Sequence, residues 1–348
     1  MRATPTYPYI QRDVELKRYN TFGIDAMSRY LTTVQHRFQL KAVLENPMVE
    51  GVPKIIIGEG SNILFTKKNY DEIVIRIDVE GIEPIFETEN HIWLNVGGGV
   101  NWHDFVLHCI KKGYGGVENL SLIPGSVGAA PVQNIGAYGV ELKDILYNLE
   151  AMDLSTGETR TFKRDECKFG YRDSIFKNEY KDQYAILYVV FVLEKIPTRF
   201  KIEYGAIRET LESMQVKELS VRAISDAVIQ IRESKLPDPR DIGNAGSFFK
   251  NPVVSSSHFA DLKKDFAEMP SFPVEKSDTV KIPAAWLIEQ CGWKGKRVGD
   301  IGVYEKQPLV LVNYEAGEGA AVLELAQQIQ ESVREKFNIE LVPEVRVY

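Results

Sequence analysis

The sequence GYGGVENLSLIPGSVGAAPVQNIGAYG, residues 113–139, mixes glycines and prolines with apolar residues such as Leu120, Val127 and Ile135. The apolar residues indicate a buried loop, whose backbone N–H and C=O groups need partners outside regular ladders. Glycines let backbone N–H groups approach a phosphate closely, and successive N–H groups form an anion-binding concavity. The stretch therefore predicts a binding loop for a cofactor with many acceptors. The alternative is a set of tight turns without a ligand.

A second glycine-rich turn lies upstream. Residues 54–57 are apolar enough for a short strand, and Gly58-Glu59-Gly60-Ser61-Asn62 follows them before apolar residues resume. A strand that feeds a turn of small residues suits a phosphate, but a hairpin turn explains the pattern equally well. A nucleotide-binding Rossmann unit is disfavoured, because GxGxxG is incomplete and no long helix pattern follows directly.

A third break, Gly97-Gly98-Gly99, follows an alternating strand pattern at residues 92–96. Asn101 then caps an expected helix whose apolar residues fall on one face. Within this helix we expect Trp102 to pack in the core and His103 to lie at the surface. Two glycine-rich breaks, at residues 58–62 and 97–99, thus precede the glycine-rich stretch 113–139, and we expect all three to form one candidate site.

The composition is that of an ordinary globular protein, with 348 residues, 44% of them hydrophobic and 26% charged, enough for two or three domains. The net charge of −7 argues against a nucleic-acid-binding surface. Residues 1–20 lack the apolar segment of a secretory signal or membrane anchor, and the longest apolar run, residues 185–193, is far shorter than the roughly 20 residues that span a bilayer. Cys109, Cys167 and Cys291 are too far apart to indicate a metal site or a disulfide framework, which fits a reducing cytoplasm.

The remainder of the chain alternates strand and helix patterns. We expect antiparallel strands at residues 146–153, 157–162 and 185–193, amphipathic helices after Ser220, at 282–292 and at 319–337, and a final strand at 340–347. The character of the sequence changes at Pro197, where the strand patterns end, and this suggests a domain boundary.

Two motifs of the first stretch, IPGSVG at residues 123–128 and QNIGAYG at residues 133–139, resemble the flavin-binding core of the UDP-N-acetylenolpyruvoylglucosamine reductase family. The resemblance runs from YNTFG at residues 19–23 to PEVR at residues 343–346, and so covers nearly the whole chain. It implies an α+β fold. An FAD-binding domain of the vanillyl-alcohol-oxidase/PCMH type, made of two α+β subdomains, is joined to a C-terminal α+β substrate-binding domain. The implied domains are residues 1–196, completed by the strand 340–348, for FAD and residues 197–339 for the substrate.

The resemblance also implies the chemistry. NADPH reduces FAD, and the flavin then reduces the enolpyruvyl double bond of UDP-N-acetylglucosamine enolpyruvate to give UDP-N-acetylmuramate, a precursor of peptidoglycan. Covalent attachment would need a His or Cys in residues 113–139, which contain neither, so non-covalent FAD is expected. The residues implied to bind FAD are Gly58, Glu59, Gly60, Ser61, Asn62, Pro124, Gly125, Ser126, Val127, Gly128, Asn134, Ile135, Gly136, Ala137, Tyr138, Gly139 and Tyr171.

Three residues match the family's catalytic positions. Arg172 lies in a GYR setting, and its permanently charged guanidinium suits a carboxylate on which negative charge builds, although a surface ion pair with Asp173 is the plainer reading. Ser247, in GNAGSFFKNP, matches the serine that the family uses as proton donor. Glu344, in PEVR, matches the catalytic glutamate, with two open roles: orienting Arg172 or hydrogen-bonding the substrate carboxylate. The sequence stops at Tyr348, where family members commonly continue, so we expect Glu344 in place but less firmly held.

The substrate diphosphate needs donors outside the flavin loops. Tyr204 matches a tyrosine that closes over this diphosphate in one branch of the family, and the segment that contains it places the chain in that branch. The residues expected to bind the substrate are Tyr204, Arg232, Lys235, Asn251 and Gln290.

Two other functions stay open at this level. Another FAD-dependent oxidase or dehydrogenase would share the loops, although GNAGSFFKNP and PEVR weigh against it. A non-catalytic nucleotide-binding or scaffold protein would be colourless and would not take up FAD. For the reductase we expect small-molecule substrates, no metal, nucleic-acid or membrane partner, a monomer and a cytoplasmic location.

Overall fold

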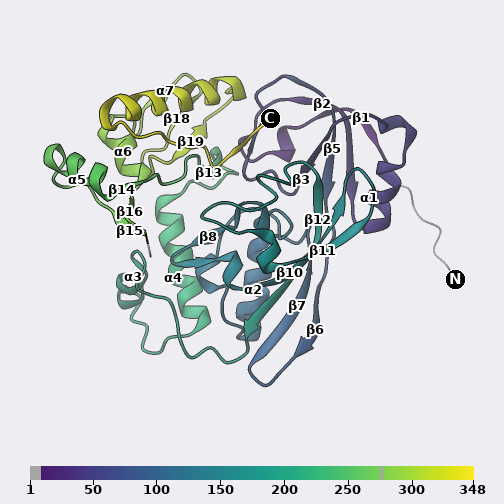
Figure 1. Ribbon diagram of the computed structural model, residues 1–348, viewed down its shortest axis with the longest axis horizontal. Helices are drawn as coiled ribbons and strands as arrows, with labels where there is room; N and C mark the ends of the chain where they lie inside the picture. Colours follow the sequence, from purple (N-terminus) through teal and green to yellow (C-terminus); the bar gives the residue numbers. More distant parts are fainter. Residues whose placement is uncertain (1–8, 275–276) are drawn as a thin grey trace. The chain divides into compact units, whose positions relative to one another are not determined.

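The chain divides into two compact units in a computed structural model that describes residues 9–274 and 277–348 (Figure 1). Within the described residues, the first unit contains 9–14, 27–60 and 69–234, and the second contains 15–26, 61–68 and 235–348. The expected functional boundary at Pro197 lies inside the first unit. That functional division stays a prediction, because compactness does not show which segment binds a substrate.

A four-stranded sheet forms one part of the first unit. Its strand order is β1 (Gln11–Glu15), β2 (Met27–Val34), β5 (Asn69–Ile77) and β3 (Lys54–Ile57). Both β2 and β3 run parallel to β5. Apolar residues of these strands pack with those of α1 (Arg37–Leu44) in one buried cluster. The expected strand at residues 54–57 is therefore confirmed, and its partner is β5.

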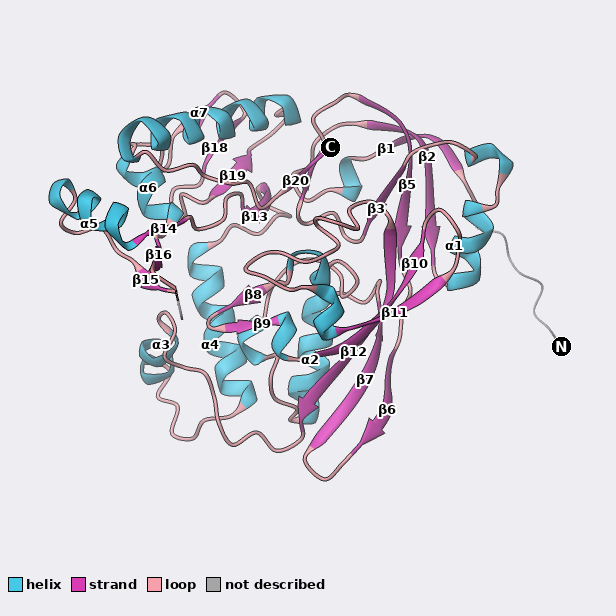
Figure 2. Cartoon of the chain, in the orientation of Figure 1, coloured by secondary structure: helices cyan, strands magenta, loops and turns pink. Residues whose placement is uncertain are grey.

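A five-stranded antiparallel sheet forms the other part of the first unit. Its order is β11 (Thr159–Lys163), β10 (Leu146–Asp153), β12 (Tyr184–Glu194), β7 (His91–Gly97) and β6 (Ile82–Glu87). The helix α2 (Trp102–Lys112) covers one face of this sheet (Figure 2). The Phe105 and Phe191 rings stack at 4.6 Å between centroids. The antiparallel strands expected here are confirmed, with β11 starting two residues later than expected.

Local signals explain where α2 begins and ends. The Asn101 side chain accepts from the Asp104 N–H at 3.0 Å, and Gly113 ends the helix at φ +76°, a conformation that suits glycine. The apolar residues of α2 fall on one stripe and are buried, Trp102 among them. The predicted cap and the core position of Trp102 are confirmed.

The glycine-rich stretch follows α2 and contains little regular structure. It holds the 3-10 helices η3 (Glu118–Leu120) and η4 (Ala130–Gln133), and β8 (Gly136–Ala137), which pairs with β9 (Val140–Glu141). The helices α3 (Ile207–Ser213) and α4 (Val221–Lys235) pack against each other through a separate apolar cluster. The predicted start of α4 is confirmed, since the Ser220 hydroxyl accepts from the Ala223 N–H at 3.1 Å.

Three small sheets and three helices are described in the second unit. One sheet has the order β13 (Gly243–Ser247), β19 (Val310–Asn313), β18 (Ile301–Val303) and β17 (Arg297–Val298); another has β14 (Val253–Ser255), β16 (Thr279–Lys281) and β15 (Phe272–Pro273). The helices are α5 (Ser256–Asp265), α6 (Ala284–Gln290) and α7 (Gly319–Phe337). The bounds predicted for α7 are confirmed, whereas α6 is shorter than expected and has Pro283 as its N-cap.

One expected strand and one alternative are not borne out. Only β20 (Arg346–Val347) forms in the predicted final strand 340–347, and it pairs in parallel with β4 (Ile63–Leu64). Residues 342–344 pair instead with residues 248–250 around an isolated antiparallel bridge between Phe249 and Pro343, so they do not extend β20. The hairpin alternative for residues 58–62 fails as well, because β3 pairs with β5 and β4 pairs with β20.

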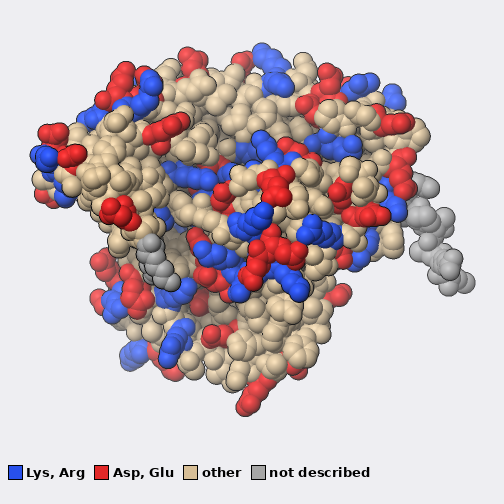
Figure 3. All heavy atoms as spheres, in the orientation of Figure 1, with Lys and Arg blue, Asp and Glu red and all other residues tan. Residues whose placement is uncertain are grey.

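Charges of both signs are interspersed over the face drawn in Figure 3. Within residues 9–274 and 277–348, no helix is long and apolar enough to cross a membrane. In the same described ranges, no group of three or more His, Cys, Asp or Glu side chains is placed to hold a metal ion.

Candidate functional site

Two of the glycine-rich turns meet in the first unit. The Glu59 carboxylate accepts from Asn101 Nδ2 at 2.8 Å and from the Gly125 N–H at 3.2 Å, across a separation of 66 residues. A Cβ on Gly58 would lie 2.0 Å from Ser126 Oγ, so no larger residue fits there without a shift. The structure thus brings the turn after β3 and the IPGSVG loop together, as the sequence predicts.

The third turn completes this arrangement. The Gly128 N–H donates to the Gly98 C=O at 2.8 Å, and a Cβ on Gly128 would lie 2.9 Å from the same oxygen. The Gly98 N–H in turn donates to the Leu187 C=O of β12 at 2.7 Å. Gly125 has φ +117°, a conformation that excludes most side chains. Three glycine-rich breaks therefore converge on one place within the first unit.

The environment of Ser126 indicates whether the point where the three turns meet suits a cofactor that carries phosphate. Its side chain is 3% exposed, and among the described residues its Oγ has no hydrogen-bond partner. A buried hydroxyl without a partner is costly, and a phosphate oxygen is a strong acceptor for it. Because the surrounding turns also lack Cβ atoms, the residues present fit FAD.

The QNIGAYG loop is held by a buried asparagine. Asn134 is fully buried, with φ +45°; its Nδ2 donates to the Glu141 carboxylate at 3.2 Å and to the Gly170 C=O at 2.9 Å, and its Oδ1 accepts from the Lys143 N–H at 3.0 Å. These bonds place the loop beside the segment that contains Tyr171 and Arg172.

Arg172 lies against this loop. Its guanidinium donates to the Gly136 C=O and lies 5.5 Å from the centre of the Tyr171 ring. Arg172 has φ +52°, a strained conformation for a residue with a side chain, and such strain is often found at functional sites. The structure therefore brings the predicted catalytic arginine together with the predicted flavin loop.

Two predicted substrate-binding residues border the same loop. Tyr204 is 47% exposed, and a Cβ on Gly139 would meet it at 3.5 Å. The Tyr204 segment is tied to the loop by Asn119, whose Nδ2 donates to the C=O groups of Tyr138 and Lys201 at 2.9 and 2.8 Å. Arg232, on α4, lies close enough to Tyr138 for its charge to act on the Tyr138 hydroxyl. Burial lowers the pKa of Arg232 and raises the pKa of Tyr138.

The second unit holds the other two predicted catalytic residues. Ser247 ends β13, and the next residue, Phe248, accepts from the Glu344 N–H at 2.7 Å. Asn62 joins this region, because its Nδ2 donates to the Glu344 C=O at 3.4 Å and its own C=O accepts from the Arg346 N–H at 3.0 Å. Main-chain pairing thus places Ser247 and Glu344 on neighbouring segments.

The remaining predicted substrate residues are more dispersed. Asn251 accepts the Ala284 N–H through its Oδ1 at 2.9 Å and so helps to start α6. Gln290 ends α6 and Lys235 ends α4, and both side chains are exposed. Their roles in substrate binding stay predictions.

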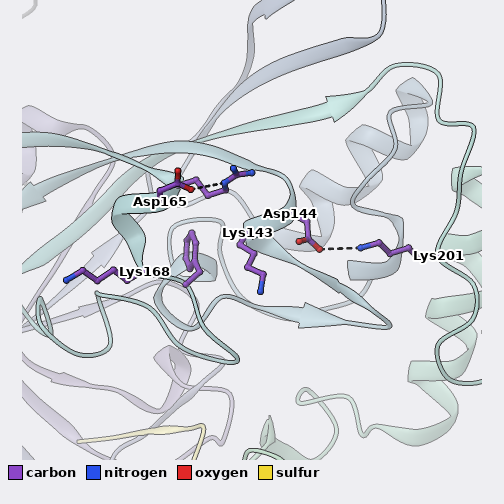
Figure 4. A pocket seen from close by; sticks show the side chains of 7 residues that line it. Lys143, Asp144, Asp165, Lys168 and Lys201 are labelled. Atoms are coloured by element: carbon purple, nitrogen blue, oxygen red, sulfur yellow. Dashed lines mark hydrogen bonds and ion pairs between the residues drawn. The ribbon is translucent and has the colours of Figure 1, made fainter. Parts of the chain in front are cut away.

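A pocket of about 650 Å³ in the first unit borders the QNIGAYG loop, since its lining residue Lys201 donates through Nζ to the Gly139 C=O at 3.2 Å (Figure 4). It is lined by Lys143, Asp144, Arg164, Asp165, Lys168, Phe169 and Lys201. Each of its cations has a carboxylate partner, at distances of 2.5 to 3.4 Å. The charge of the pocket is therefore balanced, and its lining contains none of the residues predicted to bind FAD or substrate.

His103 is a residue whose contact the sequence did not indicate. It was expected at the surface, but it is partly buried, and its Nδ1 accepts from the Leu122 N–H at 3.0 Å. A histidine near the start of an amphipathic helix carries no signal of such a contact, because the contact depends on the backbone conformation of a loop nineteen residues away.

Comparisons with known proteins agree with this arrangement. Residues 29–163 match the FAD binding domain model, and residues 238–348 match the model of the UDP-N-acetylenolpyruvoylglucosamine reductase C-terminal domain. The chain is 53% identical to a UDP-N-acetylenolpyruvoylglucosamine reductase of Amoebophilus asiaticus, over 97% of this chain and 99% of the relative. It is 47% identical to that of Flavobacterium johnsoniae, again over 97% and 99%. The crystal structure of the Thermus caldophilus reductase matches with a TM-score of 0.68 at 25% identity, over 98% of this chain and 100% of that one.

The fold and the converging loops define a flavoprotein with an FAD-binding domain and a C-terminal domain of its own, which confirms the predicted α+β class. With relatives this similar along the whole chain, the protein belongs to the UDP-N-acetylenolpyruvoylglucosamine reductase family. The resemblance carried by IPGSVG and QNIGAYG is confirmed.

Proposed function

We propose that the protein uses NADPH and FAD to reduce UDP-N-acetylglucosamine enolpyruvate to UDP-N-acetylmuramate, a step in peptidoglycan precursor synthesis. The observation that carries the proposal is the convergence of three glycine-rich turns on the buried hydroxyl of Ser126, which has no hydrogen-bond partner in the part of the chain that the structure describes. Similarity to reductases of this name along the whole chain supports it. A different oxidase of the same fold is not favoured.

The residues of the first unit that would hold FAD lie in the turn 58–60 and in the loops 124–128 and 134–139. The glycines leave room for the diphosphate, and the Ser126 hydroxyl has a proton to donate to it. FAD is bound without a covalent link. When bound, FAD takes up the reducing equivalents of NADPH and passes them to the enolpyruvyl double bond.

Arg172 stabilises the negative charge that builds on the substrate during reduction. Reduction of the vinyl group places negative charge on the adjacent carbon and its carboxylate. A guanidinium keeps its charge at all relevant pH values and meets a carboxylate with two parallel hydrogen bonds. The bond from Arg172 to the Gly136 C=O supports this role, because it fixes the cation beside the flavin loop.

Ser247 donates the proton that completes the reduction. A serine hydroxyl is a weak acid, so the residues around it must stabilise the alkoxide that forms. Glu344 is placed on the neighbouring segment by the bond from its N–H to the Phe248 C=O. Tyr204, Arg232, Lys235, Asn251 and Gln290 bind the sugar nucleotide, with Tyr204 closing over its diphosphate. The protein acts in the cytoplasm as a monomer, without membrane or nucleic-acid partners.

The visible spectrum of the purified protein tests the function. We expect a yellow protein that NADPH bleaches in the absence of oxygen and that UDP-N-acetylglucosamine enolpyruvate reoxidises with formation of UDP-N-acetylmuramate. Rapid reoxidation by air with no effect of the enolpyruvyl compound would favour an oxidase. A colourless protein that FAD cannot reconstitute would overturn the proposal.

A further inference from the structure

The residue that precedes the IPGSVG motif has an unusual conformation. Leu122 has φ +57°, which is unfavourable for a residue with a Cβ atom, so its surroundings must hold it. Two side chains do so: His103 Nδ1 accepts from the Leu122 N–H at 3.0 Å, and Arg232 Nε donates to the Leu122 C=O at 3.2 Å. Both polar groups of one strained residue are thus engaged by side chains.

These two side chains come from different helices, α2 and α4, and each helix makes a further bond to the same segment. Trp102 Nε1 of α2 donates to the Leu120 C=O at 2.9 Å. The hydroxyls of Ser121 and Ser225 of α4 hydrogen-bond at 2.8 Å. The segment 120–122 is therefore fixed between α2 and α4 at the point where the loop begins.

We propose that His103 is a positioning residue for the FAD loop: its neutral imidazole accepts the Leu122 N–H and, with Arg232, fixes where residues 123–128 begin. The inference rests on the proposed binding of FAD by that loop. His103 contacts the loop backbone and acts on FAD only through the placement of the loop.

The contact makes the loop sensitive to acid. An imidazole nitrogen accepts a hydrogen bond only while it carries no proton. Burial and the Arg232 cation lower the pKa of His103 below its ordinary value of 6.5, whereas Asp104 of the same helix acts in the opposite direction. Two further ionisable groups act on Arg232 here, Tyr138 and the Arg172 cation.

The sign of the pH effect follows from the lowered pKa. A histidine whose folded pKa lies below 6.5 contributes its bond fully above pH 6.5 and loses it as the pH falls through the folded pKa. We therefore expect the affinity for FAD to fall on acidification, by up to about tenfold for each pH unit below that pKa.

Three variants separate this role from a general effect on the fold. His103→Ala removes the acceptor. His103→Asn keeps an acceptor oxygen close to the Nδ1 position but cannot titrate. His108→Asn is the matched control, because His108 lies further along α2 and its pKa is also lowered by burial. The dissociation constant of FAD is measured on each apoprotein by flavin fluorescence between pH 5.0 and 7.5.

At pH 7.5 we expect His103→Ala to weaken FAD binding by roughly tenfold, because the partly buried Leu122 N–H loses its acceptor. His103→Asn should restore most of the affinity and flatten the dependence on pH. His108→Asn should behave as the wild type. The proposal is overturned if His103→Ala binds FAD like the wild type, or if His103→Asn keeps the wild-type pH dependence. If the alanine variant does not fold, the asparagine variant alone decides.

Hydrogen exchange gives a readout that does not depend on the cofactor. In the apoprotein at a fixed pH, the Leu122 amide should exchange faster in His103→Ala than in the wild type and in His103→Asn. Equal exchange in all three would overturn the contact. Wild-type protein that binds no FAD but shows the expected exchange pattern would overturn the proposed function and leave the contact standing.

Discussion

The glycine-rich loops of the first unit and the Ser247–Glu344 region of the second unit fix their residues by different means. In the first unit, side chains fix the loops: Glu59 accepts from the Gly125 N–H, and Asn134 donates to the Gly170 C=O. In the second unit the shorter bond joins two main-chain groups, from the Glu344 N–H to the Phe248 C=O at 2.7 Å, and Asn62 Nδ2 adds one side-chain bond to the Glu344 C=O at 3.4 Å. A position set by main-chain pairing tolerates a new side chain, whereas a position set by side chains and glycines does not. The two regions should therefore fail differently when they are mutated.

The largest effect is expected from Ser247→Ala. The main-chain pairing of β13 does not depend on the hydroxyl, so the fold and the FAD content should be unchanged. Reoxidation by the enolpyruvyl substrate should slow by at least roughly 100-fold, as is typical when a general acid is lost. Stopped-flow spectroscopy of the two half-reactions measures this.

Reduction by NADPH serves as the internal control for Ser247→Ala, because that step needs no proton from Ser247. Its rate should stay near that of the parent. Reoxidation at the parent rate would withdraw the role of Ser247 as proton donor and leave the reductase function in place. If Ser247→Ala also lost FAD, the proposed difference between the two regions would be wrong, because the structure of the second unit would then depend on a side chain as well.

A smaller effect is expected from Gly125→Val in the first unit. Gly125 has φ +117°, and a β-branched residue there costs about 2 kcal/mol, so FAD affinity should fall roughly 30-fold. Titration of the apoprotein with FAD measures it. Gly81→Val is the matched control, because Gly81 has φ +111° with open space around it and lies outside the loops. Equal loss of FAD in both variants would show strain alone to be the cause.

The smallest effect is expected from Tyr204→Phe. Tyr204 is exposed and borders the QNIGAYG loop, where we propose that it closes over the substrate diphosphate. Loss of one hydrogen bond should raise the KM for the enolpyruvyl substrate by about fivefold and leave FAD content unchanged. Tyr147→Phe, another exposed tyrosine of the first unit, is the control. An unchanged KM would count against the closing role.

Elements with local signals were predicted well from the sequence. The bounds of α7 and β10 agree with the prediction residue for residue, because apolar periodicity and flanking turns lie within the element itself. The strand at 340–347 failed because a strand also needs a partner, and β4 supplies only two residues. The length of a ladder is set by the partner, which the strand's own sequence does not describe.

In the candidate site, too, features with a local sequence signal were predicted and features without one were missed. The convergence of the glycine-rich turns was predicted from their shared composition, which signals close backbone approach. Arg172 and Ser247 were ambiguous as single residues and gained a role only through the motifs around them. The contact of His103 was missed, because it depends on the left-handed backbone of Leu122, and a leucine gives no sign of that conformation.

The pairing of β20 with β4 has a consequence for synthesis on the ribosome. Asn62 bonds to Glu344 across 282 residues, and residues 15–26 and 61–68 belong to the same unit as residues 235–348. A nascent chain emerges at roughly 5–20 residues per second, N-terminus first. The segment 61–68 can therefore bond to residues 344–347 only after those residues have emerged, whereas the described segments of the first unit are complete at residue 234. The Glu344 region and the segment 61–68 thus reach their native pairing after the last described residue of the first unit has emerged.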